Sequence, residues 1–514
     1  MTESASAEPL IHTSMRGQVL LAAIDMRDRK MNVFSWALMD ALEALIDRIE
    51  SDPAIGAAVV TSGKPSFLAG ADLEMVRGFS EMATRVPPAE LHPITGRLGR
   101  LFVRLEALAK PTVAAVNGLA LGGGLELAMA CGWRLVADDP RLQLGLPEIK
   151  LGLLPGGGGT QRMPRLIGAE KALELLLNGK PLAPAEAKAL GLVDDVVPAA
   201  ELRERAMALA AGLAGKPAER RMPARIEPGA LDFSGADAAS RLLLRYGYGE
   251  DATSRYPAYR AIVRSVVEGA EMDISAGVDN EMSRFIELMY HPAAGNMIAT
   301  LFLNRQRAEK ILLSLPSAKG IRFAIDGEGE AANGLRALLA GAKAELVAAG
   351  PADIVVGTSA SRRVADLTLM TDPSPLPPDA LGIFVRRSNS HGATIEIVGP
   401  EDSPARPKAL AIARQLWATP YVHEGARSLL ATLAAFDARA DIAGVPEDAI
   451  LAAKAAIAAE MDAEGDVGDL AIADVACVVS GLFPAYAGGP FTFLRQTSLD
   501  TLTRTSNEFP ALLA

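Results

Sequence analysis

Two glutamates accompany glycine-rich segments in the first third of the chain. Glu126 follows three glycines at 122–124 inside an apolar stretch that reaches residue 131, and Glu148 follows a proline after another apolar segment. Two carboxylates in one dry pocket can hold displaced pKa values and divide acid and base work on a water molecule or a carbon acid. Taken alone, Glu126 also fits a solvated or salt-bridged helix residue, and Glu148 a surface turn.

The same glycines indicate backbone donors for an anion. A helix that begins near Gly123 would present N–H groups without internal partners, together with the positive end of its dipole. A second N–H from the turn Ala-Gly-Ala at 69–71 could converge on the same point. Two such donors form an oxyanion hole for the enolate of a polarised thioester, and one donor is commonly worth about 3–4 kcal/mol.

Strands that alternate with helices must position these groups. Apolar runs predict strands over 19–25, 57–63, 112–116 and 133–138, while helical periodicity covers 34–50 and 123–131. This alternation indicates an α/β core, and loops at strand ends carry function in such sheets. The pattern repeats in the second half, with strands over 321–326, 353–357 and 394–399, and residues from about 405 onward are predicted to be mostly helical.

Composition narrows the class of protein. The chain has 514 residues, enough for two to four domains, and its 50% hydrophobic and 5% aromatic content favours helix-rich α/β architecture over a β-sandwich. A net charge of −11 argues against nucleic acid as a partner. The two distant cysteines, Cys131 and Cys477, predict a reducing compartment without a disulfide framework.

Other signals point to a cytoplasmic protein. The five histidines show no metal-ligand spacing, so no metal site is expected. The first 16 residues lack the pattern of a signal peptide. The sequence contains no apolar stretch long enough to predict a membrane span.

Residues 15–200 closely resemble the crotonase (enoyl-CoA hydratase/isomerase) superfamily. The resemblance rests on four motifs: AGADL at 69–73, NGLALGGGLELAMAC at 117–131, LGLPEIKLGLLPGGGGTQR at 144–162 and GLVDDVVP at 191–198. Their combination and order are highly specific. The resemblance implies the ββα superhelical spiral of that superfamily.

Carried over by position, the resemblance assigns roles to individual residues. The N–H groups of Ala71 and Gly123 would form the oxyanion hole, and Glu126 and Glu148 would be the catalytic pair. The predicted substrate-binding residues lie on the same turns and on the third glycine-rich segment: Ala69, Gly70, Asp72, Gly122 and Gly156. Among them, the Ala69 carbonyl falls where the superfamily contacts the CoA adenine, and Gly156 falls where backbone helps to place the reacting water.

The presence of both glutamates distinguishes among the activities found in the superfamily. Its hydratases keep both, whereas many of its isomerases, dehalogenases and hydrolases keep one or neither. The resemblance therefore implies syn hydration of a 2-enoyl-CoA to a 3-hydroxyacyl-CoA, in which Glu148 delivers a proton to C2 and Glu126 assists attack at C3. A Δ3,Δ2-isomerase, a CoA-thioester lyase or hydrolase, and a non-catalytic assembly subunit remain alternatives.

Partners follow from the same resemblance. The substrate would be an acyl-CoA thioester, and the protein could form a homo-oligomer or a complex with other acyl-CoA oxidation enzymes. No pattern in the sequence fixes the acyl group as fatty, steroid or aromatic.

The C-terminal half resembles the 3-hydroxyacyl-CoA dehydrogenase part of multifunctional fatty-acid oxidation proteins. The resemblance rests on NMIATLFLNRQRAEK at 296–310 and GLFPAYAGGPF at 481–491. Gly327, Gly329 and Ala332 nominally satisfy the dinucleotide fingerprint GxGxxG/A after a strand, which alone is weak evidence.

Departures from that pattern predict a degenerate module. The next strand, at 343–350, lacks the acidic residue that should hold the ribose at its end. Phe384 occupies the position of the catalytic histidine, although its partner Glu396 persists. Only 57 residues separate Gly327 from Phe384, so much of the usual fold must be missing. His391 could be a substitute base, but an exposed loop histidine is the simpler interpretation.

These departures predict that NAD binding and dehydrogenase activity are lost and that no other cofactor is used. The C-terminal half would then cover the hydratase, shape the acyl tunnel or mediate assembly; a second ligand site is the alternative. The predicted fold class is α/β, with an N-terminal crotonase ββα spiral, a truncated Rossmann-like α/β domain and a C-terminal helical domain. The predicted divisions are a hydratase core at 1–205, trailing helices and a linker helix at 206–318, a Rossmann-like domain at 319–404 and a helical domain at 405–514.

Overall fold

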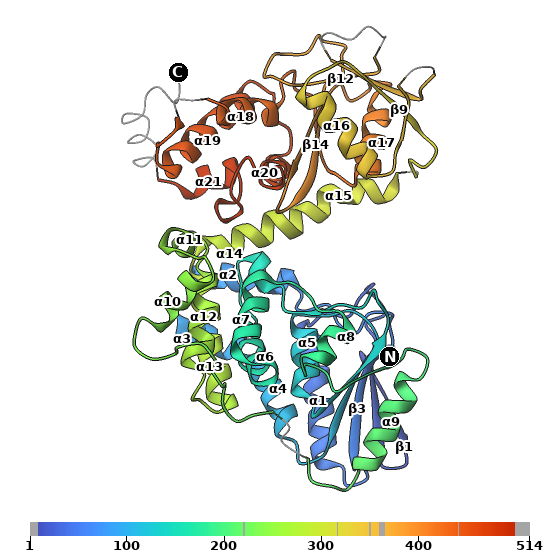
Figure 1. The fold of residues 1–514 in the computed structure, drawn as a ribbon, viewed down its shortest axis with the longest axis vertical. Coiled ribbons are helices and arrows are strands. Elements are labelled where there is room, and N and C mark those ends of the chain that lie inside the picture. Colours follow the sequence, from blue (N-terminus) through green and yellow to red (C-terminus); the bar gives the residue numbers. More distant parts are fainter. Residues whose placement is uncertain are drawn as a thin grey trace, which may run out of the picture. The chain divides into compact units, whose positions relative to one another are not determined.

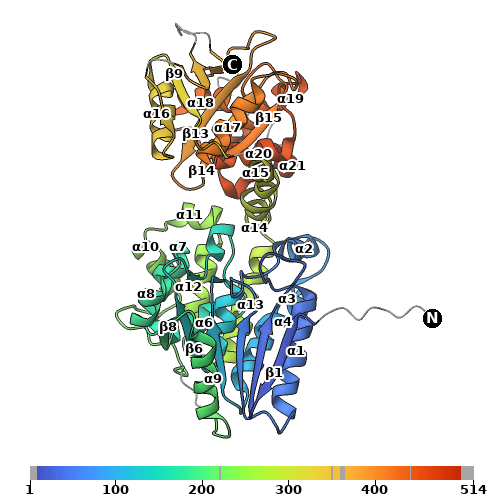
Figure 2. The same ribbon diagram turned by 90° about the vertical axis from the view of Figure 1, so that its right-hand side faces the viewer.

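A computed structural model of the chain describes residues 9–218, 222–315, 317–348, 351–358, 365–439 and 442–498. The chain divides into two compact units, Met1–Gly295 and Asn296–Ala514. Both can be followed in Figure 1 and Figure 2. The division falls inside the predicted segment 206–318, and the finer boundaries at 205, 318 and 404 stay predictions.

A six-stranded sheet forms one layer of the N-terminal unit, in the order β1-β2-β3-β4-β6-β8. All neighbours are parallel except β1 and β2. The strands are β1 (Ile11–Arg16), β2 (Val19–Ile24), β3 (Ala57–Ser62), β4 (Thr112–Val116), β6 (Trp133–Asp138) and β8 (Asp195–Pro198). The four predicted strands here are confirmed. The sequence analysis missed β1, because this largely exposed edge strand carries little apolar signal.

A second layer of short parallel strands explains the glycine-rich motifs. β5 (Ala120–Leu121) pairs with β7 (Leu144–Gly145), and isolated parallel bridges join Leu68 to Ala120 and Phe34 to Ala71. Strands β2, β3 and β4 of the large sheet are thus each followed by a short second-layer segment and then a helix, and β6 is followed by β7. This repeat is the ββα spiral, and the predicted N-terminal fold is confirmed.

Helices cover these layers (Figure 1). They are α1 (Trp36–Ser51), α2 (Leu73–Ala83), α3 (Pro88–Thr95), α4 (Arg97–Ala107), α5 (Gly123–Ala130), η1 (Glu148–Leu151), α6 (Gly159–Ile167), α7 (Ala169–Asn178), α8 (Pro184–Ala189), α9 (Leu202–Leu213), α10 (Ala238–Arg245), α11 (Glu250–Arg255), α12 (Ala258–Glu268), α13 (Ile274–Met289) and α14 (Pro292–Met297). α5 is buried on every side, as its apolar composition requires. α7 ends at Gly179, which adopts a left-handed φ of +61°.

The C-terminal unit contains a seven-stranded sheet in the order β10-β9-β11-β12-β13-β14-β15. Only β13 and β14 run antiparallel. The strands are β9 (Arg322–Asp326), β10 (Glu345–Leu346), β11 (Ile354–Gly357), β12 (Leu367–Leu369), β13 (Gly382–Ser388), β14 (Gly392–Val398) and β15 (Thr419–His423). β15 lies in the region predicted to be mostly helical, so that expectation is wrong for these five residues.

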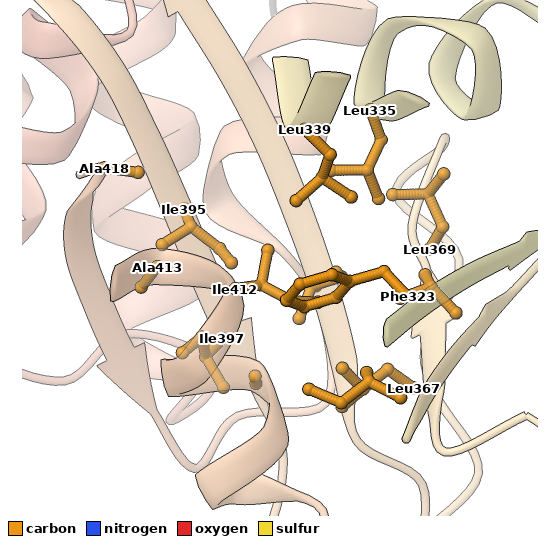
Figure 3. Close-up of a cluster of buried hydrophobic side chains, with 14 of the residues drawn as sticks. Phe323, Leu335, Leu339, Leu367, Leu369, Ile395, Ile397, Ile412, Ala413 and Ala418 are labelled. Atoms are coloured by element: carbon orange, nitrogen blue, oxygen red, sulfur yellow. The ribbon is translucent and has the colours of Figure 1, made fainter. Parts of the chain in front are cut away.

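Two helices, α16 (Glu330–Gly341) and α17 (Arg406–Leu416), bury the core of this sheet. Figure 3 shows Leu335 and Leu339 of α16 packed against Phe323 of β9 in a cluster that includes Ile395 and Ile412. The remaining helices of the unit are η2 (Ile298–Asn304), α15 (Arg305–Ser314), α18 (Leu429–Asp437), α19 (Glu447–Ala463), α20 (Leu470–Val479), η4 (Ala485–Ala487) and α21 (Pro490–Gln496). A short Rossmann-like sheet followed by helices is the predicted arrangement, and it is confirmed. Among the described helices, none has both the length and the apolar character needed to cross a bilayer.

Candidate active site

The second layer brings the three glycine-rich segments together. Leu68 pairs with Ala120, and Ala120 pairs with Leu144, in both cases as parallel neighbours. When the parallel pairing of Leu68 with Ala120 is continued by three residues, Ala71 lies opposite Gly123. The loops that follow these strands therefore meet at one end of the layer.

Two backbone N–H groups at this end are available to a ligand. Phe34 N donates to Gly70 O at 2.8 Å, and Asp72 N donates to Phe34 O at 2.9 Å. In parallel pairing this leaves the intervening Ala71 N–H directed to the opposite side. Gly123 is the first residue of α5, and its N–H has no partner in the described part of the chain. Both predicted oxyanion donors thus lack a hydrogen-bond partner among the described residues, and their catalytic role stays a prediction.

Close contacts explain why glycines precede Glu126. Gly122 is the N-cap of α5 and adopts φ +53°, a left-handed conformation that favours glycine. A Cβ at Gly122 would lie 2.5 Å from Glu148 Oε1, and a Cβ at Gly124 would collide with the carbonyl oxygen of Leu68. The motif thus lets the Glu148 carboxylate and the neighbouring strand approach the start of the helix.

Glu126 lies in the first turn of α5 and is 2% exposed. Its Oε1 accepts hydrogen bonds from Gly157 N at 2.8 Å and Gly159 N at 2.7 Å. Burial raises the pKa of Glu126, while these N–H groups and the Arg162 guanidinium oppose the rise. The Gly156 N–H, one residue before this turn, forms no hydrogen bond within the described residues and is free to hold a water molecule.

Glu148 is the first residue of η1, and its carboxyl group makes few hydrogen bonds. Its Oε2 is buried without a hydrogen-bond partner among the described residues. Burial, followed by the negative charge of Glu126, raises the pKa of Glu148 well above its ordinary value. The side chain as a whole is partly exposed, so one side of it can still reach a ligand. Of the two predicted catalytic carboxyls, Glu148 is therefore the one more readily kept protonated.

The other predicted substrate-binding residues lie on the turn before α2. Ala69 is partly exposed and its N–H donates to Asn32 O at 2.9 Å, and a Cβ at Gly70 would come 3.4 Å from Leu121 O. Asp72 instead caps α2, since its side chain accepts from Glu74 N at 3.0 Å. The structure gives Asp72 this capping contact, and the binding roles of the turn stay predictions.

The sequence analysis missed a third buried carboxylate. Glu281 of α13 is fully buried and accepts hydrogen bonds from Gly158 N at 2.6 Å and Thr160 N at 2.8 Å. Burial and then the charge of Glu126 raise its pKa to about 8. The sequence does contain a signal for this residue, because Glu281 falls on the apolar helix face formed by Val278, Met282 and Phe285. The described residues contain no group of side chains suited to hold a metal ion.

Arg162 supplies the positive charge of the site. Its side chain is fully buried on α6, and Nε donates to Glu106 Oε2 at 3.0 Å. Nη1 donates to Gly157 O at 2.7 Å. The guanidinium thus binds the carbonyl side of the turn whose N–H groups bind Glu126.

In the C-terminal unit, side chains of the same unit contact the backbone of the dinucleotide-like turn. Gly327 and Gly329 adopt φ +134° and +109° between β9 and α16. Arg336 Nη2 donates to Ile325 O at 2.9 Å and to Gly327 O. A Cβ at Gly327 would collide with Thr358. The strand that should supply a ribose-binding acid, β10, is two exposed residues long. The loss of NAD binding stays a prediction.

In the C-terminal unit, Glu396 of the predicted catalytic-like pair forms its hydrogen bonds with residues other than Phe384. Phe384 and Glu396 are directly opposed on β13 and β14, so their side chains share a face of the sheet. Glu396 is fully buried and lies 2.9 Å from His423 Nε2, and it also accepts from Leu429 N at 2.8 Å at the start of α18. The sequence analysis missed His423 because it comes from the unpredicted strand β15. Glu396 therefore caps a helix and binds a buried histidine.

His391 lies apart from this pair. It is in the turn between β13 and β14, where its backbone N–H donates to Ser388 Oγ at 3.0 Å. Four residues along β14 separate the end of this turn, at Gly392, from Glu396, a distance of about 13 Å at 3.3 Å per residue. Burial and then Arg305 lower the pKa of His391, which is half-buried rather than exposed.

Known proteins share the N-terminal pattern. A model of the family described as enoyl-CoA hydratase/isomerase matches residues 17–223. The fatty acid oxidation complex subunit alpha of Idiomarina loihiensis is 38% identical over 277 residues, which make up 53% of this chain and 38% of that protein. The match thus spans well under half the length of that curated relative.

Two solved structures are also similar. The enoyl-CoA hydratase from Bacillus anthracis is 27% identical, covering 54% of this chain and 89% of its own, with a TM-score of 0.36. A monofunctional enoyl CoA isomerase from M. smegmatis is 26% identical, covering 40% and 86% respectively, with a TM-score of 0.33. The N-terminal unit thus has the ββα spiral, and residues 17–223 within it match the model of the enoyl-CoA hydratase/isomerase family.

Proposed function

We propose that the N-terminal unit hydrates a 2-enoyl-CoA to a 3-hydroxyacyl-CoA. The observation that carries the proposal is the pair Glu126 and Glu148, two buried carboxyls that interact beside two free backbone N–H groups. An enolate formed at the thioester would be stabilised by the N–H groups of Ala71 and Gly123. The carboxyls would then act as general base and general acid in the addition of water.

The different environments of the two carboxyls support Glu126 as the base and Glu148 as the acid. Glu126 has two N–H donors and a nearby guanidinium, all of which favour its ionised form, whereas Glu148 Oε2 has no donor among the described residues. Glu126 would orient and deprotonate the water as its oxygen bonds to C3. Glu148 would give its proton to C2, and the proton taken from water would later restore the acid. Atoms balance, since the product is substrate plus one water.

The test is product analysis on a panel of 2-enoyl-CoA thioesters with fatty, aromatic and steroid acyl groups. The expected result is loss of the enoyl absorbance and formation of the 3-hydroxyacyl-CoA. Incubation in ¹⁸O-labelled water should place the label at C3. Conversion of a 3-enoyl-CoA to a 2-enoyl-CoA without hydration would instead indicate an isomerase, and release of free CoA would indicate a hydrolase. Inactivity on the whole panel would contradict the proposal.

We also propose that the C-terminal unit does not oxidise the hydration product. The support is the two-residue strand β10, which ends without the expected ribose-binding acid, and the presence of Phe384 where the resemblance places the catalytic histidine. A cytoplasmic location and assembly with other acyl-CoA oxidation enzymes stay proposals that extend the same function.

A further inference from the structure

The turn at residues 157–160 is held by two carboxylates that alternate along it. Glu126 binds the N–H groups of Gly157 and Gly159, and Glu281 binds those of Gly158 and Thr160. Four consecutive backbone donors thus point alternately to two acidic side chains. The Thr160 hydroxyl adds a third bond to Glu281, at 2.5 Å.

This turn has little else to fix its shape. Residues 157, 158 and 159 are glycines, which lose more conformational freedom on ordering than any other residue. Gly158 adopts φ +99°, and side-chain contacts cannot restrain residues that have no side chain. The backbone must therefore be held by its own N–H and carbonyl groups. The Arg162 side chain holds the Gly157 carbonyl, the first turn of α6 holds the Gly158 carbonyl, and the N–H groups are held by the two carboxylates alone.

Glu281 is itself firmly anchored. Its helix packs on α6 and α12, and the Thr160 hydroxyl that contacts Glu281 also lies 2.6 Å from Ser265 Oγ of α12. Gln161 Nε2 donates to Ser265 O at 2.8 Å in the same network. The side chain of Glu281 is fully buried, so water cannot replace its hydrogen bonds. The carboxylate thus connects the trailing helices to the turn.

We propose that Glu281 is a positioning residue of this active site: by holding Gly158 and Thr160, it fixes the turn whose alternate N–H groups orient Glu126. Its catalytic consequence rests on the hydratase activity proposed above. Glu281 acts through the backbone and touches no reacting atom. The electrostatic interaction between Glu126 and Glu281 is a second sign that the two carboxyls share one small volume.

The first test reads the turn directly and needs no turnover. In Glu281→Gln, an amide N–H₂ replaces one oxygen where three donors converge, so at least one bond is lost. We expect faster hydrogen–deuterium exchange at Gly157 and Gly159, which Glu281 does not contact, as well as at Gly158 and Thr160. Electron-transfer fragmentation gives the single-residue resolution required. Unchanged exchange at Gly157 and Gly159 in folded Glu281→Gln would overturn the proposal.

Kinetics provide the second readout. Glu281→Gln should lower kcat by about 10²-fold with KM largely unchanged, because a misplaced catalytic group costs that much while CoA contacts remain. The matched control is Glu287→Gln on the same helix, an exposed carboxylate paired with Arg264 and Arg284, which should leave exchange and kcat unchanged. Normal kcat in Glu281→Gln alongside faster exchange would overturn the catalytic part of the proposal.

A second variant covers the case in which Glu281→Gln fails to fold. Thr160→Val removes the hydroxyl bond to Glu281, together with the hydroxyl contacts to Ser265 Oγ and Gln161 Nε2, but keeps the backbone donor of Thr160 and the shape of the side chain. It should give smaller changes in the same direction in both readouts, and no change in either would overturn the proposal. If the wild-type protein hydrates no enoyl-CoA while exchange still responds, the hydratase proposal fails and the role of Glu281 in holding the turn stands.

Discussion

The carboxylate of Glu148 lies against the backbone of Gly122. A Cβ built on Gly122 would come within 2.5 Å of Glu148 Oε1, and the glycine adopts φ +53°. The glycine run and the second carboxylate, 26 positions apart in the sequence, are therefore parts of one contact. This contact is open to a direct test.

Gly122→Ala should displace the Glu148 carboxylate and reduce turnover strongly. The left-handed conformation adds a stability cost of about 1–2 kcal/mol. Gly17→Ala is the matched control, since Gly17 has a similar φ of +59° and nothing lies within 4 Å of its Cβ position. Enoyl-CoA hydration and thermal unfolding should be measured for both. Equal losses of activity in the two variants would show that strain, and not Glu148, is responsible.

Glu126→Gln and Glu148→Gln should each lower kcat by about 10²–10⁴-fold. Each substitution removes an acid–base group and almost no volume, so binding of a non-reactive acyl-CoA should change little. Steady-state kinetics and titration calorimetry measure the two effects. Glu186→Gln, on the exposed surface of α8, serves as the control. Near-normal turnover in both active-site variants would contradict the assignment.

The rate of hydration should depend on pH through both carboxyls. Because the pKa of Glu126 is raised above 4.5, the base becomes ionised, and the rate rises, only above that pH. The pKa of Glu148 is raised further, so the rate should fall again where this acid loses its proton. A profile of kcat/KM against pH checks both limbs. A rate that is maximal below pH 4.5, or that never declines at alkaline pH, would be inconsistent with these roles.

Oxidation of a 3-hydroxyacyl-CoA by NAD⁺ or NADP⁺ should be undetectable. Loss of the general base alone costs about 10²–10⁴-fold, and Phe384 cannot accept a proton. Reduced nicotinamide is followed by absorbance and cofactor binding by calorimetry, with a competent 3-hydroxyacyl-CoA dehydrogenase as the positive control. Robust turnover, or micromolar NAD⁺ affinity, would show that the C-terminal unit is a working dehydrogenase.

Glu396→Gln should destabilise the C-terminal unit by about 1–3 kcal/mol, because an amide N–H₂ would leave a buried donor without an acceptor. Hydrogen exchange of the amides in β14 and α18 measures the change. Asp353→Asn provides the contrast, since its pair with Arg322, at 3.0 Å, is exposed and screened by solvent and should contribute little to stability. If Glu396→Gln is as mild as Asp353→Asn, Glu396 is not a stabilising cap.

Local patterns in the sequence determined much of this protein. Apolar runs specified the parallel strands, and the glycine motifs before Glu126 and Glu148 indicated the family that residues 17–223 match and the point where the loops meet. Ser35 and Asp72, typical N-cap residues, begin α1 and α2 by accepting hydrogen bonds from backbone N–H groups. Such features depend on residues a few positions apart, so the sequence alone predicts them.

Only the tertiary structure decided which distant side chains complete these sites. Glu281 reaches the turn at 157–160 from a helix 121 positions beyond Thr160, and His423 reaches Glu396 from a strand that the sequence analysis missed. Burial also changes the acidity of Glu281, because removal from water and the nearby charge of Glu126 raise its pKa to about 8. Neither the partner of a buried charge nor its distance is encoded by local spacing.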